Sequence, residues 1–307
     1  MIKIKRFISL LLSIIIVVTI VINKDKLMDR LDDIFNNTKE VLVYPGNGYQ
    51  KEYDFLKLKQ STDYIPYSYD DLVNIFYSVL NQGWDKFTFY CPVEYTDCLK
   101  DVAAISYDEV LLSEINNYVH PYNSYSTIKT LYDGAGEVTI RVTYLYNDEE
   151  IKKIDEEINR ILTNKISSDM NDETRIRVLH DYIINNTKYD KKHEENDTSD
   201  YDSSRMTGLL FQNYAVCSGY TDVMAVMLEK LGVKNFRIAS KNHIWNAVYI
   251  NGEWKHLDLT WDDPVSNDGK DLLDHSYFLI DTSTLLKLDK KENEHVFDAT
   301  FYLEFNN

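Results

Sequence analysis

The chain has 307 residues, of which 44% are hydrophobic and 27% are charged, a composition that favours a folded protein over a disordered one. Its length allows two domains. The formal net charge is −17, whereas nucleic-acid binding needs clustered lysine and arginine, so nucleic acid is excluded as an expected partner.

The first segment has the pattern of a signal sequence. Lys3, Lys5 and Arg6 precede an uncharged apolar run over residues 7–22. As a helix this run extends about 24 Å, somewhat less than the ~30 Å hydrocarbon core of a membrane. Because no small-residue cleavage site follows it, we expect residues 1–25 to be an uncleaved signal-anchor, with a cleaved signal peptide as the alternative. The globular part is then membrane-anchored outside the cytoplasm, or secreted if cleavage occurs.

Residues 26–148 are predicted to form a small α+β domain of unknown role. Apolar residues at helical spacing and alternating strand-like runs indicate its elements. The expected elements are helices over 67–83 and 108–118, a strand over 86–91 and a hairpin that turns at 134–136. Cys91 and Cys98 either form a disulfide, as an exported protein permits, or remain two free thiols.

Residues 149–307 are predicted to form a second domain. Isoleucines at helical spacing predict one helix from Asn147 and another from Asp172. Residues 187–206 are charged and aperiodic, which indicates a surface loop with His193 in solvent.

Cys217 stands at the start of a strongly periodic stretch. Val223, Met227 and Leu231 recur at helical spacing, and Gly232 is suited to end the helix as a left-handed cap. Cys217 therefore falls in the first turn, where unpaired backbone N–H groups and the helix dipole favour a thiolate. An ordinary buried cysteine under a helix start is the alternative.

A hairpin downstream supplies partners for this cysteine. Asn251–Gly252 lies between alternating apolar runs and predicts a two-residue type I′ turn. Reading the register outward from this turn pairs Ala247 with His256, and strand alternation then defines the two faces. One face carries His243, Trp245, Ala247, His256, Asp258 and Thr260. His243 and Asp258 are diagonal neighbours, about 7–8 Å apart at the backbone, which is within reach of a His–carboxylate hydrogen bond.

A carboxylate-oriented histidine and a helix-start cysteine are the groups that nucleophilic thiol catalysis requires. The stretches that carry them are VCSGY (216–220), NHIWNAVYINGEW (242–254) and LDLTWDDP (257–264). In this chain order of Cys, His and Asp they resemble the transglutaminase-like superfamily, and the resemblance extends over about residues 170–307.

The resemblance implies a papain-like α+β core, in which the cysteine lies on a helix packed against an antiparallel sheet. It also implies Cys217 as the nucleophile, His243 as the general base and acid, and Asp258 as the residue that orients His243. The family includes cross-linking enzymes, peptidases, amidases and inactive members.

Three further residues are expected to support the catalytic residues. An oxyanion hole would use the backbone N–H of Cys217 and one further donor, for which Gln212 is a candidate because it lies just upstream. Trp245 is expected to line the site or to fill the core. His256 is expected to support the site from behind or to be structural.

No metal and no other cofactor is predicted. The acidic residues over 262–271 do not have the spacing of a calcium loop, and Cys217 and His243 lack the paired-ligand spacing of zinc sites. His275 and His295 are expected to be structural.

The sequence therefore predicts a cysteine-dependent acyl-transfer enzyme that forms a thioester with a peptide or glutamine-type amide. A hydrolase at the cell surface, acting as a peptidase or amidase on a protein or cell-wall peptide, is the expected form. A protein-crosslinking transglutaminase and a catalytically inactive surface-binding module are the alternatives. The substrate, the acyl acceptor and the oligomeric state stay open at this point.

Overall fold

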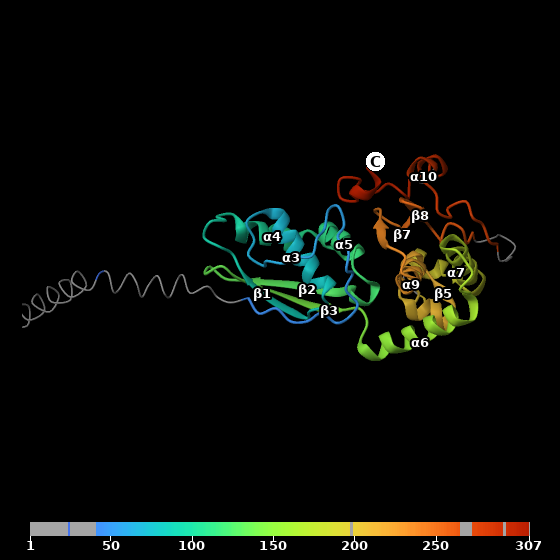
Figure 1. Ribbon diagram of the computed structural model, residues 1–307, viewed down its shortest axis with the longest axis horizontal. Coiled ribbons are helices and arrows are strands. Elements are labelled where there is room, and N and C mark those ends of the chain that lie inside the picture. The colour runs from blue at the N-terminus through green and yellow to red at the C-terminus, as the bar shows by residue number, and fades with distance from the viewer. Residues whose placement is uncertain (1–23, 25–40, 197–198, 265–271, 291–292, 307) are drawn as a thin grey trace, which may run out of the picture. The chain divides into compact units, whose positions relative to one another are not determined.

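The computed structural model describes Lys24 and residues 41–196, 199–264, 272–290 and 293–306 (Figure 1). The predicted signal-anchor over residues 1–25 lies outside these residues, apart from Lys24. Among the residues described, no helix is both long enough and apolar enough to cross a membrane. Leu42–Asn307 forms one compact unit, and the domain boundary at residue 148 stays a prediction.

The first part of this unit is an antiparallel sheet with helices on one face (Figure 1). Its strands follow the spatial order β1-β3-β2, so that the predicted hairpin forms and β1 pairs with its second strand. The elements are α3 (Tyr69–Asn81), β1 (Lys86–Tyr90), α4 (Cys98–Tyr107), α5 (Glu109–Asn117), η1 (Pro121–Asn123), β2 (Tyr125–Tyr132) and β3 (Glu137–Tyr144). Cys91 and Cys98 form a disulfide, which links the end of β1 to the start of α4.

The second part begins with two helices that start at well-formed caps. Asn147 and Glu150 form a reciprocal capping box at the start of α6 (Asp148–Lys165). Asn171 caps α7 (Asp172–Asn186) by accepting the backbone N–H of Thr174 at 2.8 Å. Both helices therefore begin within a residue of the predicted positions.

The charged stretch over 187–206 contains more structure than the predicted loop. It includes β4 (Lys188–Tyr189) and α8 (Lys191–Asn196). β4 pairs in parallel with β5 (Tyr214–Ala215), and this pairing holds the stretch against the residues that precede Cys217. A short π-helical turn, η2 (Gly208–Gln212), lies between them.

The predicted hairpin is present in the predicted register. β7 (Ile244–Ile250) and β8 (Glu253–Leu257) pair so that Ala247 faces His256. Asn251 and Gly252 have φ values of 55° and 86°, the left-handed conformations that a type I′ turn requires. With β6 (Asn235–Ala239) on the other side of β7, the strands form an antiparallel sheet of order β6-β7-β8.

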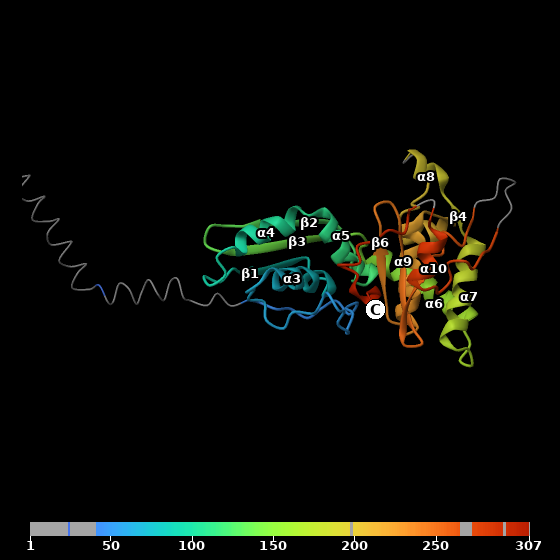
Figure 2. The same cartoon turned by 90° about the horizontal axis from the view of Figure 1, so that it is seen from above.

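The helix that carries Cys217 packs on this sheet. α9 (Cys217–Lys230) lies against β6 and β7, in an α+β arrangement that agrees with the predicted fold class (Figure 2). Its middle turns are buried throughout, and Gly232 has the expected left-handed φ of 72°. After β8 the chain continues through α10 (Thr282–Leu288) to η3 (Leu303–Phe305).

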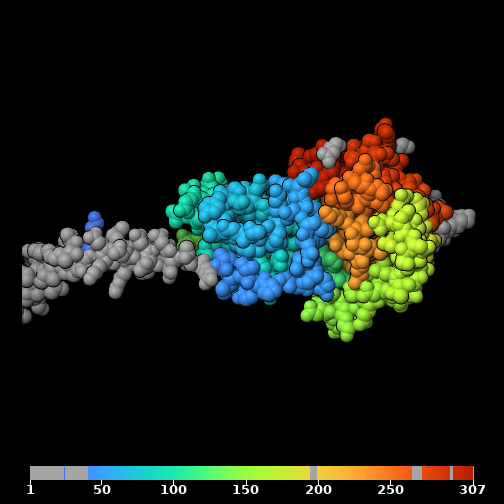
Figure 3. All heavy atoms as spheres, viewed as in Figure 1, coloured from blue at the N-terminus to red at the C-terminus, as the bar shows by residue number. Residues whose placement is uncertain are grey.

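A buried arginine joins the two parts of the unit. The Arg237 guanidinium on β6 donates to Asp222 Oδ1 on α9 at 2.7 Å and to Ser124 Oγ at 2.8 Å. The same side chain donates to the carbonyl oxygen of Val119 at 3.3 Å. In the space-filling view, the blue and teal surface of the first part meets the orange surface of the β6–β8 region (Figure 3). The first part is therefore fastened directly to the sheet on which α9 packs.

Candidate active site

Cys217 is the first residue of α9, and its side chain is half-buried. Its backbone N–H belongs to the first turn, where helical N–H groups have no intrahelical acceptor. Gly219 allows a close approach at this turn, because a Cβ there would lie 2.7 Å from the carbonyl oxygen of Ser203. The predicted placement of a thiol at a helix start is thus present, and another chain segment packs closely beside it.

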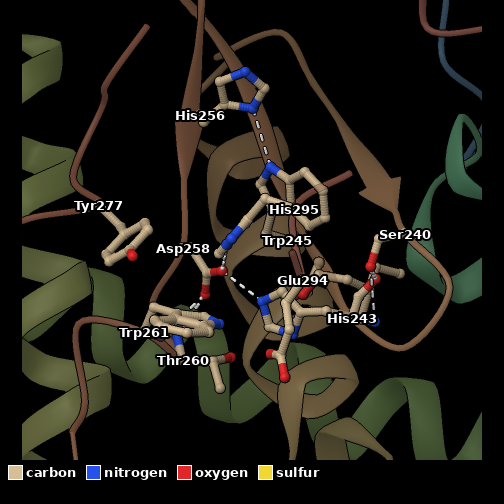
Figure 4. Close-up of polar contacts among 12 residues, drawn as sticks. Ser240, His243, Trp245, His256, Asp258, Thr260, Trp261, Tyr277, Glu294 and His295 are labelled. Atoms are coloured by element: carbon tan, nitrogen blue, oxygen red, sulfur yellow. Dashed lines mark hydrogen bonds and ion pairs between the residues drawn. The ribbon is translucent and has the colours of Figure 1, made fainter. Parts of the chain in front are cut away.

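His243 directly precedes β7 and is held by a tight turn. Ser240 N–H donates to the His243 carbonyl oxygen at 2.8 Å, and His243 N–H donates to Ser240 Oγ at 3.1 Å (Figure 4). The His243 ring is buried, and its Nε2 lies 2.5 Å from Asp258 Oδ2. Cys217 lies close enough to the ring for its hydrogen bonding and charge to raise the pKa of His243. Since Nε2 faces Asp258, Nδ1 is the nitrogen left for the thiol.

Asp258 lies one residue beyond the end of β8, not inside a strand. Its Oδ1 accepts the backbone N–H groups of Thr260 at 2.9 Å and Trp261 at 3.2 Å. These bonds bend the chain away from the sheet, so the extended strand that would have placed Thr260 opposite His243 does not form. The carboxylate is fully buried and still reaches His243, as the register predicted.

His295 is a partner that the sequence did not reveal. Its Nε2 lies 2.9 Å from Asp258 Oδ2, the same oxygen that His243 contacts (Figure 4). Its Nδ1 lies 3.2 Å from Asp289 Oδ1, and the ring stacks on Tyr277. The residue is fully buried. Cys217, His243, Asp258 and His295 therefore form a continuous series of contacts that ends at Asp289.

The charges of this series reinforce one another. Burial by itself lowers the pKa of His243, but the charge and hydrogen bond of Asp258, followed by those of Cys217, outweigh it and raise the pKa to about 10. Burial raises the pKa of Asp258, but the charge of His243 and the hydrogen bonds from His243 and His295 hold it well below its usual range. Near neutral pH, His243 is therefore an imidazolium beside the Asp258 carboxylate.

Trp245 and His256 lie behind the His243 ring. The Trp245 indole stacks on His243, with ring centroids 5.7 Å apart. Its Nε1–H donates to His256 Nδ1 at 3.0 Å, and His256 Nε2 lies 3.1 Å from Thr282 Oγ1. Burial lowers the pKa of His256 to about 3, so this ring is neutral and its Nδ1 accepts. His256 thus contacts Trp245 rather than Asp258.

Gln212 does not reach the site. Its side chain is exposed, and its Oε1 accepts the backbone N–H of Asp202 at 2.7 Å. Asn213 follows it with a left-handed φ of 61°, which turns the chain before Cys217. The structure therefore does not support Gln212 as an oxyanion donor.

A cavity of about 950 Å³ opens over Cys217 and His243. Charged and polar side chains make up much of its wall, including His193, which was expected in solvent. The lining residues are Tyr189, Lys191, His193, Val216, Cys217, Asn242, His243, Thr260, Trp261, Asp263, Pro264 and Glu294. A substrate that enters this cavity meets the thiol and the imidazolium together.

Residues 160–259 match the transglutaminase-like superfamily. This segment of the chain is transglutaminase-like. It contains Cys217, His243 and Asp258, and the resemblance inferred from the sequence is confirmed over these residues. The transglutaminase-like match supports a cysteine enzyme in general terms. No curated protein sequence matches the chain.

Several solved structures are similar to this chain at low identity. A protein described as a TGase is 15% identical with a TM-score of 0.34, and the match covers 45% of this chain and 44% of the TGase. A candidate cysteine protease from Cytophaga hutchinsonii is 13% identical with a TM-score of 0.28, covering 50% of this chain and 69% of that one. A candidate protease from Parabacteroides distasonis is 14% identical with a TM-score of 0.23, covering 49% and 41%. At these similarities, the activities of the three proteins say nothing of this chain's substrate.

Proposed function

We propose that this protein is a cysteine-dependent acyl-transfer enzyme that attacks a peptide or glutamine-type amide and passes the acyl group to water. The observation that carries the proposal is the position of His243, whose ring contacts Cys217 on one side and Asp258 on the other. Its raised pKa, about 10, favours a thiolate–imidazolium pair at neutral pH. That pair is the reactive form of a cysteine nucleophile.

In the proposed reaction, the Cys217 thiolate attacks the amide carbonyl carbon and forms a tetrahedral intermediate. The backbone N–H of Cys217 donates to its oxyanion, and the Asn242 side chain, which lines the cavity beside His243, is the proposed second donor. As the C–N bond breaks, the amine or ammonia leaves with the proton from His243 Nδ1, and a thioester remains. Water then attacks the thioester, His243 takes its proton, and the carboxylic acid leaves as Cys217 is released.

Water is the proposed acceptor because the cavity is open and polar around the thiol. Lys191, Asp263 and Glu294 are among its lining residues, so a thioester at Cys217 is accessible to solvent. The location at the cell surface, with a protein or cell-wall peptide as substrate, belongs to the same proposal. It rests on the apolar run over residues 7–22 that follows a basic start.

The test uses the full-length chain with glutamine-containing peptides, in the presence and absence of a primary amine. Intact-mass spectrometry of the enzyme detects the acyl-enzyme, and peptide mass spectrometry separates backbone cleavage, side-chain deamidation and amine incorporation. Cys217→Ala is expected to abolish all products, whereas Ser218→Ala, in the same helical turn, is the matched control and is expected to retain them.

Hydrolysis products that require Cys217 would support the proposal. Amine incorporation in excess of hydrolysis would favour the cross-linking alternative. If no acyl-enzyme and no product form over a broad peptide mixture, while both variants remain folded, the proposed activity is wrong and a binding module is the better interpretation.

A further inference from the structure

A second cluster of histidine and carboxylate side chains lies outside the candidate active site. His180 and Asp181 lie on α7, and His275 lies in the segment that leads to α10. Asp181 Oδ1 is 2.9 Å from His180 Nδ1 and 2.7 Å from His275 Nε2. These three atoms, each a typical metal ligand, all lie within 4.8 Å of one another.

A buried carboxylate orients His180 from the other side. Asp262 Oδ2 is 3.1 Å from His180 Nε2, and both side chains are completely buried. The other oxygen, Oδ1, accepts the backbone N–H of Tyr277 at 2.8 Å. The contact with Asp262 engages Nε2 of His180, while Nδ1 faces Asp181. Metal-binding histidines usually have this kind of carboxylate partner on the second ring nitrogen.

One carboxylate oxygen joins the two rings of this cluster. Asp181 Oδ1 contacts both His180 and His275, whose rings stack with centroids 5.2 Å apart. A divalent cation bound among these atoms would take one lone pair from each ring and one from the carboxylate at once.

We propose that His180 Nδ1, Asp181 Oδ1 and His275 Nε2 bind a divalent first-row transition metal ion, with zinc as the expected ion. Two imidazole nitrogens and one carboxylate oxygen suit zinc, whereas calcium and magnesium prefer sites made of oxygen alone. The side chains of Asp181 and His275 are 32% and 33% exposed, so the ion can enter from solvent and keep a water as its fourth ligand. A tetrahedral zinc ion holds its ligand atoms about 3.3 Å apart, so Asp181 Oδ1 would move away by about half an ångström from each of the two nitrogens that it contacts.

The ion would connect α7 to a part of the chain 94 residues later. The ion would also stabilise the chain beside the active-site cavity. Asp262, which orients His180, is adjacent in sequence to Asp263, which lines the cavity. The site is independent of whether Cys217 is a nucleophile.

The test measures binding of Zn²⁺ alone to the full-length chain after treatment with a chelator and dialysis. All proteins carry Cys217→Ser, so that the thiol and His243 do not compete for the ion. We expect one Zn²⁺ per chain by isothermal titration calorimetry and a higher Tm when zinc is added. Asp181→Asn and His275→Gln should each weaken binding at least about 10-fold, and Asp262→Asn should weaken it by about 10–100-fold.

Asp172→Asn is the matched control, because it removes an exposed carboxylate from the same helix and should bind zinc as the parent does. Circular dichroism without metal establishes that each variant is folded. Since His275 is partly exposed, His275→Gln decides the matter if Asp181→Asn does not fold. Co²⁺ substitution gives a second readout, with the visible absorption of a tetrahedral site expected only in the parent and the control. Absence of zinc binding in the parent, or equal binding in His275→Gln, would overturn the proposal.

Discussion

In the proposed enzyme, replacement of Asp258 by Asn should make Cys217 react with alkylating agents as slowly as an ordinary thiol does. The variant keeps the shape of the side chain and removes its charge, which is fully buried and contacts both His243 and His295. The assay needs no knowledge of the substrate, because iodoacetamide reacts with the thiolate form of cysteine and the product is counted by intact-mass spectrometry.

The size of the expected effect on the Cys217 thiol follows from the electrostatics of His243. Its pKa is raised from 6.5 to about 10, a difference that corresponds to about 5 kcal/mol in favour of the imidazolium. The charge of Asp258 is the largest favourable contribution. Loss of one partner from a buried pair costs about 3–5 kcal/mol, which is enough to remove the thiolate–imidazolium pair at neutral pH.

The expected change in rate is limited by the behaviour of a free thiol. An ordinary cysteine with a pKa of about 8.5 is only about 3% ionised at pH 7, so alkylation of Asp258→Asn should be about 30-fold slower than that of the wild type. The two rates should converge above about pH 9, where an ordinary thiol is also ionised. This dependence on pH distinguishes lost activation from simple loss of access.

Asp298→Asn is the matched control, because Asp298 is exposed in the C-terminal segment and holds Thr300 rather than a histidine. It should alkylate as the wild type does at every pH. Superimposable profiles for Asp258→Asn and wild type, or a deficit that does not vary with pH, would refute the electrostatic reasoning.

Three further changes test other parts of the structure. His295→Gln removes a ring contact to Asp258 but retains an N–H donor, so alkylation of Cys217 at pH 7 should slow by no more than about 10-fold. His243→Gln removes a group whose folded-state pKa of about 10 exceeds its usual 6.5; its stabilising contribution is complete below pH 6.5 and is lost as the pH rises towards 10. The difference in Tm between wild type and His243→Gln should therefore shrink over that interval, as measured by differential scanning fluorimetry. Arg237→Met leaves Asp222 buried without its ion-pair partner and should cost about 3–5 kcal/mol, seen as a fall in Tm of roughly 10 °C.

Each of these expectations has a contrary outcome. A rate for His295→Gln as low as that of Asp258→Asn would mean that His295 is as important as the carboxylate itself. A Tm difference for His243→Gln that grows with pH would reverse the sign of the predicted linkage. For Arg237→Met, the matched control is Arg160→Gln on the exposed face of α6, and equal Tm values for the two variants would show that the buried pair does not stabilise the junction.

Local signals in the sequence were sufficient to predict the helix and the hairpin. The apolar stripe of α9 and the left-handed Gly232 define the helix that Cys217 starts, and Asn251–Gly252 sets the register of β7 and β8. Because side chains alternate along strands, that register was enough to bring His243 and Asp258 to one face. The predicted position of Thr260 was wrong because the carboxylate of Asp258 bends the chain out of the strand. The alternation of side chains predicts faces only while the strand continues.

The contacts that the sequence did not reveal are those made by distant segments. His295 reaches Asp258 only after the chain has passed through α10, 37 residues further on, and no local pattern marks it. His275 meets Asp181 across 94 residues for the same reason. Gln212 is the opposite case. It is close to Cys217 in the sequence, but the left-handed turn at Asn213 separates the two side chains.

The carboxylate of Asp258 also controls where protons can leave the site. Both of its oxygens are engaged, Oδ2 by His243 and His295 and Oδ1 by the backbone N–H groups of Thr260 and Trp261. A buried carboxylate with both oxygens engaged in this way offers little opening for water or for a substrate. Exchange with solvent therefore takes place at the opposite end of the His243 ring, on the side of the cavity. Among the described residues, the cavity side of His243 is thus where this centre exchanges protons, and whatever occupies the cavity controls that exchange.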